Sequence, residues 1–164
     1  MKKKFLIPVI LFFALLIGGL WYTRPQNFWA ATDIDRDKIT GASGYAIQSY
    51  VTAGKPSQQT WFLDSLIPGQ EDYEALMELL EGTSYRASLQ NLLPPSSSHP
   101  ADHITATASF ALGDELVVIH ADYPGKVWIA SPAHSRTLVF SISPGNLNET
   151  LTDFIQQWGT AGNS

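Results

Sequence analysis

Two of the four histidines have a spacing that could hold a metal ion. His99 and His103 are four residues apart, so on a helix their rings would lie on one face and could share a metal. Pro100 lies between them in a stretch rich in proline and serine, which disfavours a helix. No glutamate follows His99 in the manner of a metalloprotease helix. We therefore predict no metal site and no cofactor.

The other two histidines lie in or beside predicted strands. His120 has Asp122 nearby in the sequence, and His134 has Arg136 nearby. If the strands brought these residues to one end of a sheet, they could form an acid–base site. A histidine at a strand edge that is hydrogen-bonded or in contact with water explains the pattern more simply.

Three aspartates have the opening spacing of a calcium-binding loop. Asp33, Asp35 and Asp37 would fill its first, third and fifth positions. The sixth position, which needs glycine, is Lys38, and the twelfth, which needs a bidentate glutamate, is Gly44. An EF-hand loop is thus excluded, and a solvated segment is the better interpretation.

Nucleophilic chemistry finds little support. The segment Gly41-Ala42-Ser43-Gly44 approaches a nucleophile elbow, but its second glycine comes one residue early. The chain has no cysteine, which excludes thiol catalysis and disulfides. Paired carboxylates for glycoside hydrolysis cannot be located from the sequence. We predict that the protein is not an enzyme; a hydrolase with a dispersed site is the least favoured alternative.

Aromatic residues on or beside predicted strands are candidates for ligand contact. A row of exposed rings could stack on sugars or peptide, although such residues more often fill a core. Tyr123 and Trp128 flank a predicted tight turn, which makes them the best candidates for exposure. The residues in question are Tyr45, Tyr50, Trp61, Tyr123 and Trp128.

Tyr85 and Arg86 form a second candidate contact, because an arginine beside an aromatic ring suits recognition of a carboxylate. A structural ion pair from Arg86 to Glu78 or Glu81 explains the pair equally well. The candidate ligand or partner contacts are Tyr85, Arg86, Tyr123, Trp128, His134 and Arg136.

The N-terminal segment predicts a location. Lys2–Lys4 precede Phe5–Tyr22, an uncharged run of about 18 residues that would extend about 27 Å as a helix, close to a hydrocarbon core of about 30 Å. We predict a transmembrane helix with the N-terminus cytoplasmic and the C-terminus extracytoplasmic. A cleaved signal peptide is the alternative, but Phe28 and Trp29 are too bulky for the position three residues before a cleavage site.

This assignment divides the chain into cytoplasmic lysines and a membrane anchor (1–23), a juxtamembrane stalk (24–40) and an extracytoplasmic domain (41–164). The whole chain has a formal net charge of −5, but six basic and fifteen acidic residues follow Arg24, a net charge of −9. Such a balance disfavours nucleic acid as a partner. The expected contacts are the lipid bilayer, through the helix, and a protein of the cell envelope or membrane.

Hydrophobic periodicity predicts an α+β domain. Tyr73, Leu76, Met77 and Leu80 form one apolar face of a helix over 71–81 that ends near Gly82. A closing helix begins after Asn146, with Glu149 placed for a capping box. Two helices packed on one face of an antiparallel sheet would bury both apolar stripes. Strands are expected over 45–51, 60–63, 104–112, 116–121, 127–130 and 136–142, while 85–93 is ambiguous between strand and helix.

The layout resembles that of small, uncharacterised, membrane-anchored extracytoplasmic proteins of Firmicutes. The resemblance comprises the lysine-led apolar segment, the acidic start of the helix at Asp72-Tyr73-Glu74, the Tyr85-Arg86 pair, a strand meander and a closing helix. It covers most of the chain and implies no activity. The preferred hypothesis is a non-enzymatic module that binds a partner protein, and the alternative is a module that binds wall glycan or peptide.

Overall fold

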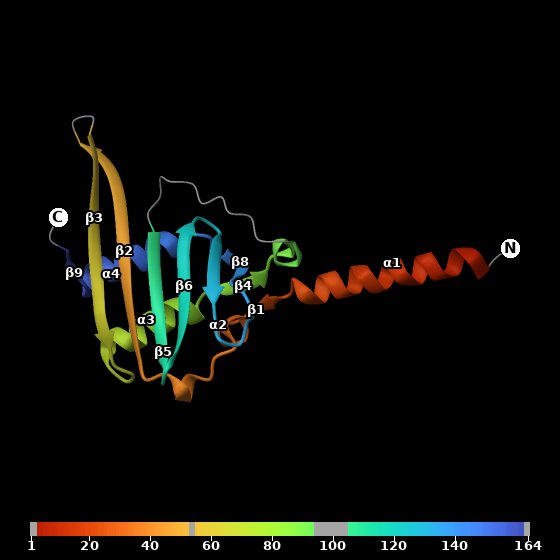
Figure 1. Ribbon diagram of the computed structural model, residues 1–164, viewed down its shortest axis with the longest axis horizontal. Coiled ribbons are helices and arrows are strands. Elements are labelled where there is room, and N and C mark those ends of the chain that lie inside the picture. The colour runs from red at the N-terminus through yellow and green to blue at the C-terminus, as the bar shows by residue number, and fades with distance from the viewer. Residues whose placement is uncertain (1–2, 53–54, 94–104, 163–164) are drawn as a thin grey trace.

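The fold is built on one large antiparallel sheet. The computed structural model describes residues 3–52, 55–93 and 105–162, and within them nine strands run in the order β1-β4-β8-β7-β6-β5-β2-β3-β9. Figure 1 shows the long β2–β3 hairpin extending beyond its neighbours. The strands are β1 (Pro25–Gln26), β2 (Gly41–Thr52), β3 (Lys55–Leu66), β4 (Ser84–Ala87), β5 (Thr105–Leu112), β6 (Glu115–Tyr123), β7 (Lys126–Ala130), β8 (Leu138–Ser143) and β9 (Thr160–Ala161).

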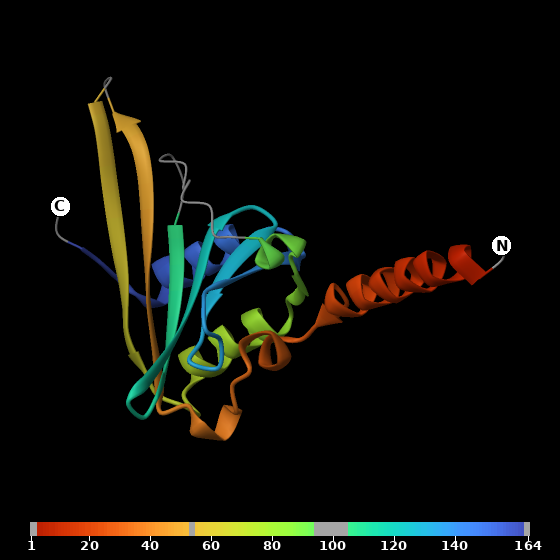
Figure 2. The same ribbon diagram turned by 45° about the vertical axis from the view of Figure 1, so that its right-hand side comes forward.

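Three helices cover one face of this sheet. They are α2 (Phe28–Thr32), α3 (Glu71–Glu81) and α4 (Leu147–Trp158). In Figure 1 they lie behind the strands, and the 45° turn in Figure 2 brings them out beside the sheet. The predicted α+β architecture, with helices on an antiparallel sheet, is therefore present, and we call the opposite side the open face.

Both predicted domain helices form. Helix α3 has the bounds that its apolar periodicity predicts, and it buries Tyr73, Leu76, Met77 and Leu80. Helix α4 begins after Asn146, but the predicted capping box is wrong, because the Asn146 side chain accepts no hydrogen bond at the helix start. The Asn146 carbonyl instead accepts from the amides of Glu149 and Thr150, both at 3.0 Å.

Small residues let α4 pack closely on the middle strands. The floor beneath it is formed by Ala42, Gly44, Ala46, Ala106 and Ala108. A Cβ at Gly44 would lie 2.6 Å from the Thr107 carbonyl oxygen and 3.5 Å from Ile155 Cδ1 of α4. Glycine is thus required at this point by the close approach of its neighbours.

The strands correct several predictions. Strands β2 and β3 are twelve residues each, because their polar ends also pair across the hairpin. The ambiguous stretch 85–93 contains β4 and then a short 3-10 helix, η2 (Leu89–Leu92). There the Asn91 side chain donates to the Val139 carbonyl and accepts from the Val139 amide, extending the edge beside β8. His99, Pro100 and His103 lie outside the described residues.

Residues 24–40, predicted as a stalk, belong to the folded domain. Strand β1 pairs with β4, and Asn27 caps α2 by accepting from the Ala30 amide at 2.9 Å. Phe28 is fully buried, and Ile34 and Ile39 are also buried on either side of a 3-10 helix, η1 (Arg36–Lys38). The prediction failed because these apolar side chains are isolated in the sequence and show no periodicity.

The N-terminal helix α1 (Lys3–Tyr22) projects away from the domain (Figure 1). Among the described residues, no helix is both long and apolar enough to cross a bilayer. The predicted transmembrane helix and single-pass membrane location are therefore wrong.

Candidate functional site

Alternation along the strands separates two sets of side chains. Ala46, Ala106, Ile119 and Ile129 point toward the helices and are fully buried. Since successive side chains of a strand point to opposite sides of the sheet, their neighbours in sequence lie on the open face. This face carries the aromatic and hydroxyl side chains that helices do not cover.

One line of cross-strand neighbours on the open face is rich in rings. The register pairs Phe62 with Tyr45, Tyr45 with Thr107, Thr107 with His120, and His120 with Trp128. These residues come from five adjacent strands, so the line spans about 19 Å at 4.7–4.9 Å between strands. Together with Tyr123, which contacts Trp128, we call them the aromatic row: Phe62, Tyr45, Thr107, His120, Trp128 and Tyr123.

The rings of this row are partly accessible to solvent. Phe62 is 46% exposed, and Tyr45, His120, Trp128 and Tyr123 are half-buried. Thr107, at the centre, is only 1% exposed. Its Oγ1 lies 3.1 Å from His120 Nδ1 in a hydrogen bond that fixes the orientation of the imidazole. The row is thus a ring surface with a buried polar support.

A β-bulge brings Tyr123 onto the same face. The register between β6 and β7 shifts between His120 and Tyr123, so that Tyr123 lies opposite Lys126. Without this shift, alternation would direct Tyr123 to the helix side. The Tyr123 and Trp128 rings lie 5.5 Å apart at 51°. Desolvation, and secondarily the Asp122 carboxylate, raise the pKa of the Tyr123 phenol above its ordinary value.

Hydroxyl groups border the row on both sides. On one side, Thr60 and Thr105 lie opposite Ile47 in β2. On the other side, Ser43 pairs with Ser109, which pairs with Val118. These neighbours are uncharged and mostly small. The hydroxyl groups on these two sides can both donate and accept hydrogen bonds, whereas the Tyr123 end of the row is charged, with Asp122 and Lys126 beside it.

Tyr85 and Arg86 lie on opposite sides of the sheet. Tyr85 is fully buried against Phe28 and Phe140, and its hydroxyl donates to the Leu80 carbonyl at 3.1 Å. Burial raises the pKa of Tyr85 strongly. Arg86 is exposed on β4, and within the described ranges no ion pair joins it to Glu78 or Glu81. Tyr85 is thus a core residue, and Tyr85 and Arg86 do not form a joint contact surface for a ligand.

His134 and Arg136 lie in the loop between β7 and β8. His134 Nε2 lies 3.5 Å from the Ala31 carbonyl oxygen, on the helix side. Arg136 is exposed and donates to the Leu93 carbonyl at 3.3 Å. His120 lies on the open face instead, so the structure does not bring the two histidines together. In the part of the chain that the structure describes, no group of three His, Cys, Asp or Glu residues could hold a metal ion.

A groove of about 710 Å³ lies at one end of the sheet. Carboxylates at its border come from Asp33, Asp35 and Glu115, and Lys38 lies 3.8 Å from Asp35 in an ion pair. The Asp35 side chain also accepts from the Asp37 amide, and Asp33 ends α2 in the left-handed conformation. These aspartates therefore end and begin helical turns rather than converge on one point.

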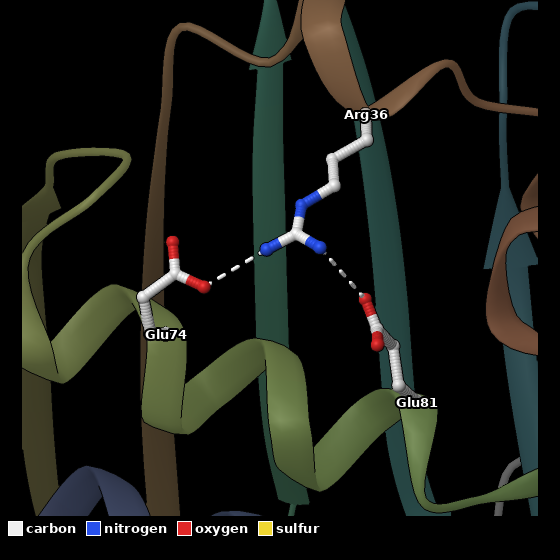
Figure 3. Close-up of polar contacts among 3 residues, drawn as sticks. All are labelled: Arg36, Glu74 and Glu81. Carbon is white, nitrogen blue, oxygen red and sulfur yellow. Dashed lines mark hydrogen bonds and ion pairs between the residues drawn. The ribbon is translucent and has the colours of Figure 1, made fainter.

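Arg36 bridges η1 to α3 (Figure 3). Its guanidinium lies 2.8 Å from Glu74 and 3.8 Å from Glu81, and all three side chains are substantially exposed. It also lies 5.9 Å from the centre of the Trp29 ring. This cluster attaches the loop before β2 to the helix layer. Its role is structural, and the sequence contained no signal for it.

The aromatic row was only partly foreseen from the sequence. Tyr45, Tyr123 and Trp128 were candidates and lie on the open face, whereas Trp61 packs toward the core and Tyr50 shares the parity of Ala46. Phe62 was missed. In the run Trp61-Phe62-Leu63, alternation directs Trp61 and Leu63 to one side of the strand and Phe62 to the other side. Compared with protein-family models, curated proteins and solved structures, the chain matches none.

Proposed function

We propose that this protein is a non-enzymatic binding module whose contact surface is the open face of the sheet. The observation that carries the proposal is the aromatic row, in which rings from β2, β3, β6 and β7 remain partly exposed after folding. Rings of this size are usually buried when they serve only the core. Their exposure in one line suits an elongated ligand.

The chemistry around the row favours binding over catalysis. His120 is hydrogen-bonded to the hydroxyl of Thr107, which orients its ring as part of the row. The groove with three carboxylates is lined by no histidine. These features support a surface that contacts a ligand without transforming it.

If the ligand were a partner protein, we would expect the contact surface to be a continuous apolar patch with a polar rim. The row instead has Thr107 and His120 between its rings, and serine and threonine side chains beside it. A ligand with many polar groups therefore suits the open face better than an apolar protein surface.

Photo-crosslinking in cells tests where the contact lies without assuming the class of ligand. p-Benzoylphenylalanine replaces Ser43, which is exposed on the open face beside Tyr45, in the full-length chain. The control carries the same probe in place of Gln157, which is exposed on α4. We expect adducts of increased mass from position 43 and few from position 157, because the probe reacts with C–H bonds of any close partner. Equal adduct yields at the two positions would show that the open face is not the contact surface.

A further inference from the structure

The aromatic row also indicates a class of ligand. Resting on the proposed function, we infer that the open face binds a neutral, extended glycan chain that lies across the strands. The row is perpendicular to the strands and spans about 19 Å, long enough to contact several sugar rings in succession. A linear polymer can use this length, whereas a single small molecule cannot.

The rings suit the apolar faces of sugars. A pyranose presents C–H groups on its faces, and these pack against the electron-rich face of an aromatic ring. Phe62 and Tyr45 lie on one side of Thr107, and Trp128 and Tyr123 lie on the other side. Two ring clusters separated by a buried threonine therefore form two stacking positions on one surface.

The hydroxyl groups beside the row suit the edges of sugars. Thr60, Thr105, Ser43 and Ser109 each carry a hydroxyl that can donate and accept, as sugar hydroxyls also do. A proline-rich peptide, the other extended ligand that aromatic surfaces bind, offers carbonyl acceptors but few donors. The surface therefore matches a glycan better than such a peptide.

Charge is consistent with a neutral ligand. The row itself and the hydroxyl residues beside it include no carboxylate, lysine or arginine. Lys126, opposite Tyr123, places one cation at that end of the row, but a polyanionic chain would find none among the residues of the row themselves. The chain as a whole has a net charge of −5, which also opposes polyanions. An uncharged polysaccharide has no such electrostatic barrier.

Calorimetric titration of the full-length chain with cellohexaose and with chitohexaose tests this inference. We expect saturable binding of at least one of them. Tyr45→Ala and Trp128→Ala are each expected to weaken it by about tenfold, which corresponds to about 1.4 kcal/mol. Tyr45→Phe keeps the ring and should retain affinity. Thermal unfolding measured by circular dichroism verifies that each variant is folded.

Tyr50→Ala is the matched control. Tyr50 is a tyrosine of the same strand, 44% exposed, whose side chain lies on the opposite side of the sheet from Tyr45. Its replacement should change affinity by less than twofold. An equal loss in Tyr50→Ala and Tyr45→Ala would overturn the inference, because the contact would then not follow the row.

Two further outcomes separate this inference from the proposed function. If neither oligosaccharide binds at millimolar concentration but position 43 still crosslinks to a partner, the glycan is wrong and the binding module stands. Tight binding of decaproline without binding of either oligosaccharide would likewise replace the glycan by a peptide. If crosslinking and both titrations fail, the open face is not a binding surface and both proposals fall.

Discussion

The two faces of the sheet are formed by the same strands, but their aromatic side chains differ in burial. On the helix side, Phe28 lies between the rings of Tyr85 and Phe110, and all three are fully buried. On the open face, Phe62 and Tyr45 are cross-strand neighbours, but both remain in contact with solvent. Similar residue types thus differ in role according to whether a helix covers them. The exposed fraction of a ring, rather than its identity, distinguishes a core residue from a candidate contact.

A charge on the helix side should have the largest effect. Leu151 of α4 is fully buried, so Leu151→Asp would place an unpaired carboxylate in the core at a cost of several kcal/mol. Since a domain of this size is stable by about 5–15 kcal/mol, we expect loss of cooperative unfolding in circular dichroism. Phe154→Asp should act in the same direction. Gln157→Asp, on the exposed side of α4, is the control, and an unchanged melting temperature for Leu151→Asp would show that α4 does not pack on the sheet.

Truncating one phenylalanine on each face compares them directly. Phe28→Ala removes a ring buried among aromatic residues and should cost about 3–5 kcal/mol. Phe62→Ala removes a ring that is 46% exposed and should cost about 1 kcal/mol or less. Urea unfolding followed by circular dichroism measures both values. Equal losses would mean that the open face is also packed as a core.

The buried phenol of Tyr85 should make the helix side sensitive to alkali. Burial raises its pKa in the folded state above the ordinary value of 10.0, so folding favours the protonated form. The stabilisation that this contributes is complete below about pH 10 and is lost as the pH rises above it. Tyr85→Phe should cost about 1 kcal/mol at pH 7, through the lost hydrogen bond to Leu80, and should flatten the decline in stability above pH 10.

Melting temperatures from pH 7 to 11 provide the measurement for this variant. The wild-type protein should lose stability at high pH by more than Tyr85→Phe does. Parallel curves for the two proteins would contradict the assignment of the alkaline effect to Tyr85.

The ion pairs of Arg36 should have the smallest effect. The side chains of Arg36, Glu74 and Glu81 are 51%, 48% and 38% exposed, so solvent screens the attraction between their charges (Figure 3). Arg36→Ala should cost less than about 1 kcal/mol in urea unfolding, and the difference from wild type should shrink at high salt. A larger loss that salt leaves unchanged would show that the aliphatic part of Arg36 packs against Trp29 and contributes more than its charge.

Local pattern was enough to predict the elements with strong periodicity. The apolar stripe of α3 and the alternation of β5 each placed apolar side chains on a buried face. Gly125 adopts a positive φ in the tight turn predicted between Tyr123 and Trp128. The closing helix was also predicted, although its capping box was not formed. Residues 24–40 were assigned wrongly, because the burial of Phe28 depends on β4 and β5, which follow much later in the chain.

What the sequence alone determined is therefore the local pattern: the α+β composition, most helix and strand positions, and the absence of cysteine chemistry. Only the tertiary structure decided which side of each strand the helices cover. The register and the bulge before Tyr123 then aligned rings from distant segments into the aromatic row. The physical reason is that alternation specifies two faces for every strand, whereas burial of one face depends on packing against elements far away in the sequence.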